Sequence, residues 1–144
     1  MEYKKSVLVP FSAKQMFMLV DDINSYREFL PWCVDSKESD RSNDSVVGAV
    51  YLEYLKIKFH FVTKNHNTLY SQIKMDLVDG PFKTLSGYWK FTQLGEDGCK
   101  VSLELQYQFI NPVMDKLIGP IFAKVTANLV ECFIKQAKVK YQTT

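Results

Sequence analysis

The sequence has few residues of the kinds that cross-link a chain or bind metals. Three cysteines, Cys33, Cys99 and Cys132, are widely spaced and form no C-x-x-C motif. An odd number of scattered cysteines argues against a disulfide framework or a zinc site and is typical of a reducing compartment. His60 and His66 are the only histidines. Since two histidines without a third ligand make a poor metal site, we interpret both as surface residues.

Strong net charge and long hydrophobic runs are absent as well. The formal net charge of +2 is too small to indicate a DNA-binding protein. No run approaches the about 18 apolar residues of a membrane span. Pro10 and Ser12 interrupt the N-terminal stretch before it could form the core of a signal peptide. We therefore expect a soluble cytoplasmic protein, with peripheral contact at the inner membrane as an alternative place of action.

Catalytic motifs are missing too. No serine or cysteine has a nucleophile-elbow context, and there is no glycine-rich phosphate loop. Asp21 and Asp22 are adjacent, so on a helix they would point about 100° apart and form no carboxylate pair. Few polar residues are candidates for an apolar interior, and they are Tyr51, Gln72, Tyr107 and Thr126. The sequence therefore predicts a binding protein rather than an enzyme.

Apolar and aromatic residues, in contrast, are plentiful. They make up 47% and 14% of the 144 residues. A chain of this length is most simply one domain, here residues 1–144, and buries about two-thirds of its unfolded surface. Aromatic side chains build both cores and the walls of apolar cavities.

The first part of the chain predicts a strand followed by two short helices. Residues 3–9 are rich in apolar and β-branched types. Ser12 and Gln15 form a capping box for a first helix, and residues 24–30 predict a second short helix that Pro31 ends. Alternating or β-rich segments then follow at residues 34–39, 45–54, 56–64, 69–78, 84–94 and 99–109.

A long amphipathic helix closes the sequence. Asn111 is its expected N-cap and Pro112 its first residue, and apolar residues recur at helical spacing to about Lys140. Pro120 predicts a kink near Ile118 because it removes a backbone hydrogen bond. A run of strands followed by a helix predicts an α+β fold in which the apolar faces of sheet and helix bury each other.

Three segments resemble the START-like, helix-grip (SRPBCC) superfamily, in its branch of coenzyme Q-binding proteins and ribosome-association toxins. They are residues 9–33, 77–91 (LVDGPFKTLSGYWKF) and 109–138. The resemblance implies a curved antiparallel sheet of about seven strands wrapped around the C-terminal helix, with an elongated apolar cavity. Some members bind ubiquinone or other polyprenyl lipids and support respiratory electron transport. Others are toxins that bind the large ribosomal subunit and block subunit joining, and the superfamily also contains cyclases.

We expect a cavity of several hundred Å³ between sheet and helix, with a bound ubiquinone or polyprenyl lipid as its only cofactor-like occupant. Gly48 and Gly87 interrupt strands, which indicates sheet bending or the close approach of another group. The residues expected to bind ligand are Trp32, Phe82, Leu85, Trp89, Phe91, Leu103, Leu105, Tyr107, Phe122, Val125, Leu129 and Phe133. Each of them is also a plausible core residue.

Phe82 has two expected placements. Pro81 cannot donate a backbone hydrogen bond, so the Asp79-Gly80 sequence predicts a wide loop rather than a tight hairpin. Phe82 then either folds onto the core as a plug or forms a cavity lip beside Trp32.

Lysines carry the alternative interpretation. A ribosome or membrane contact predicts a basic surface built from Lys56, Lys58, Lys64, Lys83 and Lys90. The simpler interpretation is that these lysines belong to ordinary solvated strand faces.

Overall fold

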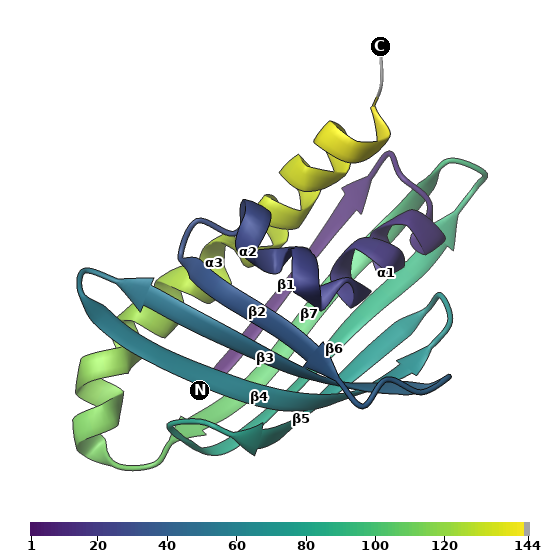
Figure 1. The fold of residues 1–144 in the computed structure, drawn as a ribbon. Coiled ribbons are helices and arrows are strands. Elements are labelled where there is room, and N and C mark those ends of the chain that lie inside the picture. Colours follow the sequence, from purple (N-terminus) through teal and green to yellow (C-terminus); the bar gives the residue numbers. More distant parts are fainter. Residues whose placement is uncertain (143–144) are drawn as a thin grey trace.

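The computed structural model describes residues 1–142 and shows seven strands curled around one long helix (Figure 1). The sheet is antiparallel throughout, in the order β1-β7-β6-β5-β4-β3-β2. The predicted α+β helix-grip fold is confirmed. The elements are β1 (Glu2–Val9), α1 (Ala13–Asp21), the 3-10 helix η1 (Ile23–Ser25), α2 (Tyr26–Phe29), β2 (Cys33–Ser39), β3 (Ser45–Tyr54), β4 (Ile57–Thr68), β5 (Gln72–Asp79), β6 (Phe82–Leu94), β7 (Gly98–Phe109) and α3 (Pro112–Tyr141).

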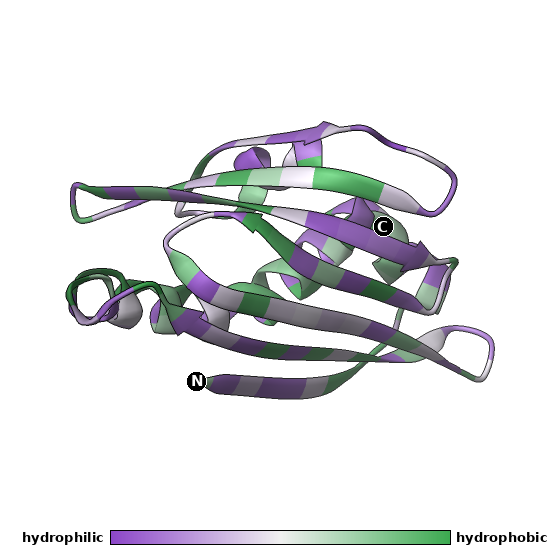
Figure 2. Ribbon diagram, turned by 90° about the horizontal axis from the view of Figure 1, so that it is seen from below, coloured by the Kyte–Doolittle hydropathy of each residue, from purple (hydrophilic) through white to green (hydrophobic). Residues whose placement is uncertain are grey.

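The strands present one apolar face to the helices. Successive side chains of a strand point to opposite sides, so the alternating sequence of β7 buries every second residue from Cys99 to Phe109. Figure 2 shows this alternation of hydrophobic and hydrophilic residues along several strands. We call the side of the sheet that faces α3 the inner face and the solvated side the outer face.

The predicted capping box of α1 is present. The hydroxyl of Ser12 accepts from the backbone N–H of Gln15 at 3.1 Å, and the Gln15 side chain accepts from the N–H of Ser12 at 2.9 Å. The second short helix differs from the prediction. Its start is the 3-10 turn η1, and Ser25 donates its hydroxyl to the Asp22 carboxylate at 2.7 Å instead of capping α2.

Helix α3 is the central helix of the fold. The side chain of Asn111 accepts from the N–H of Met114 at 2.9 Å, as expected of an N-cap. The helix continues for 30 residues through Pro120, and Figure 1 shows its first turns set at an angle to the rest. By length and composition alone, α3 could cross a membrane. In the structure it packs on β7, β1 and α1, and buries Phe122 and Phe133, among others.

The hairpin between β5 and β6 is splayed. Only Gly80 and Pro81 separate the two strands, but pairing between them ends at Asp76 and Ser86. Beyond that point, β5 pairs with β4 alone and β6 pairs with β7 alone. The tight hairpin is therefore absent, as predicted, and the opening admits the side chain of Phe82 to the inner face.

Candidate functional site

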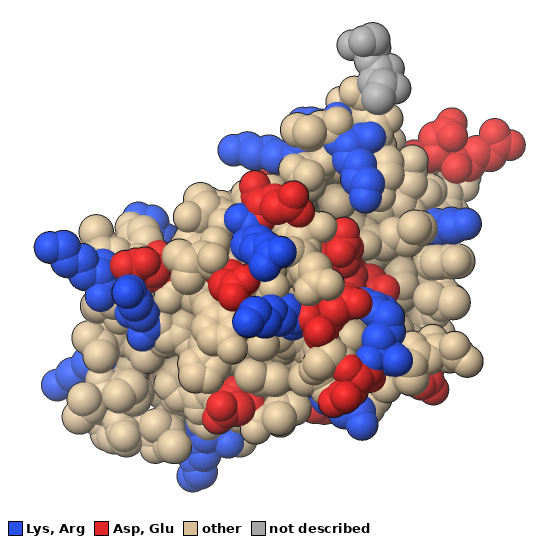
Figure 3. Space-filling view, viewed as in Figure 1, with Lys and Arg blue, Asp and Glu red and all other residues tan. Residues whose placement is uncertain are grey.

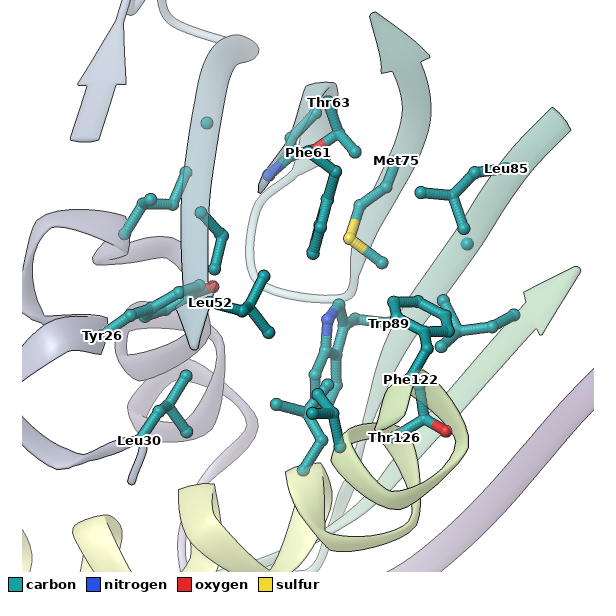
Figure 4. Close-up of a pocket in the computed structure, with 18 of the residues that line it drawn as sticks. Tyr26, Leu30, Leu52, Phe61, Thr63, Met75, Leu85, Trp89, Phe122 and Thr126 are labelled. Carbon is teal, nitrogen blue, oxygen red and sulfur yellow. The ribbon is translucent and has the colours of Figure 1, made fainter. Parts of the chain in front are cut away.

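An apolar cavity of about 90 Å³ lies between the inner face of the sheet and α3. Side chains from β3, β4, β5, β6 and α3 converge on it (Figure 4). The cavity is much smaller than predicted because large side chains on both walls occupy most of the space between sheet and helix. It is lined by Ile23, Tyr26, Leu30, Trp32, Gly48, Val50, Leu52, Phe61, Thr63, Asn65, Met75, Leu85, Gly87, Trp89, Leu105, Phe122, Val125, Thr126, Leu129 and Phe133.

Eight of the twelve predicted ligand-binding residues line this cavity. Both tryptophans of the chain are among them. The eight are Trp32, Leu85, Trp89, Leu105, Phe122, Val125, Leu129 and Phe133. The structure brings these residues together from the loop before β2, from β6 and β7, and from three turns of α3.

The other four, Phe82, Phe91, Leu103 and Tyr107, lie in the packed core outside the cavity lining. The ring of Phe82 stacks on that of Phe109 with centroids 5.0 Å apart, and meets Phe122 at the same distance. Phe82 and Trp32 belong to separate hydrophobic clusters. Of its two expected placements, Phe82 therefore takes the plug position, and it forms no lip with Trp32.

The two strand glycines face the cavity. A Cβ atom on Gly48 would lie 2.7 Å from Ile23 Cδ1, and one on Gly87 would lie 2.6 Å from Met75 Cε. A glycine in each strand therefore allows a side chain in the interior to approach the backbone closely. Sequence analysis identified both positions but could not predict the neighbours that fill them.

Sequence analysis missed nine of the lining residues, and these are Ile23, Tyr26, Leu30, Val50, Leu52, Phe61, Thr63, Asn65 and Met75. Thr63 and Asn65 form a polar pair among them. Both lie on the inner face of β4, are 5% and 7% exposed, and are joined by a hydrogen bond of 2.7 Å from the Thr63 hydroxyl to Asn65 Oδ1. The signal that could have identified them is the two-residue alternation along the strand. The inner residues Ile57, Phe59 and Phe61 continue at the same spacing into Thr63 and Asn65.

Most other polar groups near the cavity have partners of their own. The hydroxyl of Tyr26 donates to the carbonyl of Val20, and burial raises the Tyr26 pKa well above its usual range. Thr126 donates to the carbonyl of Ala123 at 3.0 Å. Of the polar residues expected to enter the interior, Thr126 alone lines the cavity, since Tyr51, Gln72 and Tyr107 do not. Tyr51 stacks on His60 at the outer face.

The predicted lysine set lies on the outer face and at turns, where acids accompany it. Lys58 is paired in register with Glu53, and Lys64 with Asp76. His60 and His66 are both 47% exposed on this face, each 3.4 Å from an aspartate. Figure 3 shows the same mixing of positive and negative side chains on the side of the molecule that it presents.

The three cysteines are free, and two of them are buried. Burial raises the pKa of the Cys33 and Cys99 thiols to about 11, which disfavours their nucleophilic thiolate form. Within residues 1–142, no three His, Cys, Asp or Glu side chains are placed to hold a metal ion.

Comparison with known proteins places this geometry in a family. Residues 9–134 match the family model described as polyketide cyclase / dehydrase and lipid transport. A ribosome association toxin RatA from Vibrio cholerae is 43% identical over 140 residues, covering 97% of each chain. The RatA of Escherichia coli is 38% identical over 140 residues, which is 97% of this chain and 89% of the relative. The mitochondrial coenzyme Q-binding protein coq10 of Schizosaccharomyces pombe is 25% identical over 153 aligned residues, covering 97% and 88%.

Solved structures agree on the fold. A START superfamily protein from Mycobacterium smegmatis superposes with a TM-score of 0.79 at 18% identity, over 95% of this chain and 97% of the other. The Zhui aromatase/cyclase from Streptomyces gives 0.83 at 10% identity, over 96% and 93%. The chain belongs to the polyketide cyclase / dehydrase and lipid transport family of START-like proteins, in the branch that holds the RatA toxins and the coenzyme Q-binding proteins.

Proposed function

We propose that this protein is a non-enzymatic carrier of a hydrophobic ligand, ubiquinone or another polyprenyl lipid, and that it supports respiratory electron transport. The observation that carries the proposal is the almost wholly apolar cavity between sheet and α3. A cavity of this kind can bind an isoprenoid without charged side chains. Burial of the isoprenoid contributes about 25 cal/mol to the binding free energy for each Å² of apolar surface removed from water.

A ligand must enlarge the cavity as it enters. At about 90 Å³ the cavity is below the roughly 300 Å³ at which small-molecule sites typically begin. Met75 and Leu129 line it and are only partly buried, and methionine is unbranched and adapts readily to new surroundings. Displacement of such side chains, with a small shift of α3, would extend the space along the sheet. Loading from a bilayer would also require brief contact with a membrane surface.

The direct test is a titration of delipidated protein with a short-chain ubiquinone. Trp32 and Trp89 are the only tryptophans and both line the cavity, so tryptophan fluorescence, excited selectively over that of the eight tyrosines, reports on that place. We expect saturable quenching, and we expect extraction of freshly purified protein to release a quinone. No quenching, together with no extracted lipid, would contradict the proposal.

Ribosome association is the second candidate. The named relatives with the highest identities reported above are RatA toxins, and the outer face and its turns carry Lys56, Lys58, Lys64, Lys83 and Lys90. Since acids lie among these lysines, we expect binding to the large ribosomal subunit to be weak and strongly weakened by salt. Sedimentation of the protein with purified large subunits at two salt concentrations checks this. Failure to sediment with them at low salt would argue for the carrier function alone.

A further inference from the structure

The cavity is lined by an amide group whose N–H donors have no hydrogen-bond acceptor within residues 1–142. Asn65 is more than nine-tenths buried, and its only side-chain hydrogen bond within residues 1–142 is the one that Oδ1 accepts from Thr63. Its Nδ2 group, with two N–H donors, is left without a partner in that part of the chain. Asn65 also lies between apolar neighbours, since its register partners are Val46 on β3 and Met75 on β5.

A second donor faces the same space. Trp89 is 3% exposed and lines the cavity, and its indole N–H makes no hydrogen bond within the described residues, while its backbone pairs with Ile73 and Leu103 in the sheet. Its ring reaches into the cavity in Figure 4. The indole N–H usually finds a partner when it is buried. In residues 1–142 the one fully enclosed side-chain polar atom without a partner is Asn67 Oδ1, so the Asn65 and Trp89 nitrogens both keep some accessible surface. Since both residues line the cavity, a ligand that enters it can supply acceptors for these two nitrogens.

We infer that the cavity recognises the carbonyl end of its ligand through Asn65 Nδ2, with Thr63 as the residue that positions the amide. This inference rests on the proposed carrier function and names the polar chemistry of the same site. The Thr63 hydroxyl donates to Asn65 Oδ1, which turns Nδ2 away from Thr63 and leaves it free to donate. A quinone ring suits such a site because its carbonyl oxygens accept hydrogen bonds and carry no hydrogen that could be donated.

The cavity lining also sets the direction of the ligand. Thr63 pairs in register with Gly48, and β3 continues from there through Val50 to Leu52. This stretch of strand, from Gly48 to Leu52, covers about 14 Å, at about 3.4 Å for each residue. Trp32 and Leu30 lie in one hydrophobic cluster with Val50 and Leu52. The ring therefore binds at the Thr63–Asn65 end, and the prenyl chain extends toward Leu52.

The experiment compares two probes on four proteins. The probes are a short-chain ubiquinone and the same prenyl chain on a plain benzene ring, which has no acceptor. The proteins are the unchanged chain, Asn65→Leu, Thr63→Val and the matched control Asn128→Leu. Asn128 lies on the exposed side of α3, where its side chain donates to the carbonyl of Lys124.

We expect Asn65→Leu to weaken ubiquinone binding about three- to tenfold and to leave binding of the benzene analogue unchanged or stronger. Thr63→Val should weaken ubiquinone binding less, because the amide is retained but no longer held in place. Asn128→Leu should bind both probes as the unchanged protein does. Equal losses for both probes, or no loss for either, would overturn the role of Asn65. If the unchanged protein binds neither probe, the carrier function fails and this inference fails with it.

A stability measurement separates recognition from folding. Replacing both members of a buried hydrogen-bonded pair by apolar groups of similar shape is often nearly neutral. The double variant Thr63→Val/Asn65→Leu should therefore unfold at the same temperature as the unchanged protein or higher, while it loses the preference for ubiquinone. A double variant that keeps this preference would overturn the inference.

Discussion

Single residues show why the inner face could be predicted but the lining of the cavity could not. Alternation in sequence places Tyr107, Phe82 and Leu105 on the same side of the sheet as the cavity. Leu105 lines the cavity, whereas Phe82 and Tyr107 close their rings against Phe122 with centroids 5.0 and 4.8 Å away. A residue on the inner face either packs against another side chain or lines the cavity, depending on how aromatic rings from distant segments fit together. The alternation of residues along a strand predicts the face but not this packing.

The plug position of Phe82 leads to a prediction about stability. Phe82→Leu removes a ring that packs against Phe109, Phe122 and other aromatic side chains, so it should lower the free energy of unfolding by about 2 kcal/mol. Urea unfolding measures this. Ubiquinone affinity should change little, since Phe82 is not part of the lining. A large loss of affinity with full stability would instead place Phe82 at a lip. Tyr51→Leu, at the outer face, is the control and should cost less than about 1 kcal/mol.

Elements were predicted where local chemistry decides them. The Ser12 and Asn111 caps and the alternation of β7 are local signals, and the structure confirms each. The segment around η1 was predicted less well, because Asp22 binds the Ser25 hydroxyl and the chain turns before α2 begins. The course of β4 was cut short in sequence analysis since polar residues at its inner positions resemble the end of a strand.

Strand β3 offers a test of the cavity through Gly48. In Gly48→Val, the new Cβ would lie 2.7 Å from Ile23 Cδ1 and the added methyl groups would occupy cavity space. We expect a stability loss of about 1–3 kcal/mol from overpacking, together with clearly weaker ubiquinone binding in the fluorescence titration. Ala49→Val, one residue along and on the outer face, should leave binding unchanged. Unimpaired binding by Gly48→Val would mean that the ligand lies elsewhere.

Arg41 links β2 to the end of α1, and its contribution to stability should depend on pH. Its guanidinium binds both carboxylate oxygens of Glu38, at 2.9 and 2.7 Å, and reaches Asp21 at the end of α1. The hydrogen bond from Arg41 lowers the pKa of Glu38 below the unfolded value of 4.5. This contribution to stability is therefore fully present above about pH 4.5 and is lost as pH falls through the lowered folded pKa.

The corresponding variant is Arg41→Gln. At neutral pH it should lower the free energy of unfolding by less than about 1 kcal/mol, since the pair is partly exposed and screened by solvent. At pH 3 the difference from the unchanged protein should shrink. Chemical unfolding at both pH values measures it. A difference that is the same at both would assign the effect to lost packing rather than to the ion pair.

The whole molecule separates an interior from an exterior that have different chemistry. The interior is apolar with a few buried polar groups, while the outer face carries both lysines and acids. The overall fold was predictable because sheet and helix each have one apolar face and must bury it. The volume of the cavity was not predictable, because it is the space that remains after large side chains from the sheet and the helix have packed against each other.

This separation predicts that the two proposed functions can be removed independently. The triple variant Lys58→Glu/Lys64→Glu/Lys90→Glu reverses three exposed charges on the outer face, so it should abolish sedimentation with large ribosomal subunits at low salt. Ubiquinone binding should persist, because none of the three residues lines the cavity.

The matched control is Lys116→Glu/Lys135→Glu/Lys138→Glu, which makes the same charge change at exposed positions of α3. It should still sediment with the subunits if the outer face of the sheet is the contact surface. Equal losses in both triple variants would show that net charge, rather than this face, governs the association. Loss of ubiquinone binding in the outer-face variant alone would contradict the separation, since charges outside the cavity would then control what enters it.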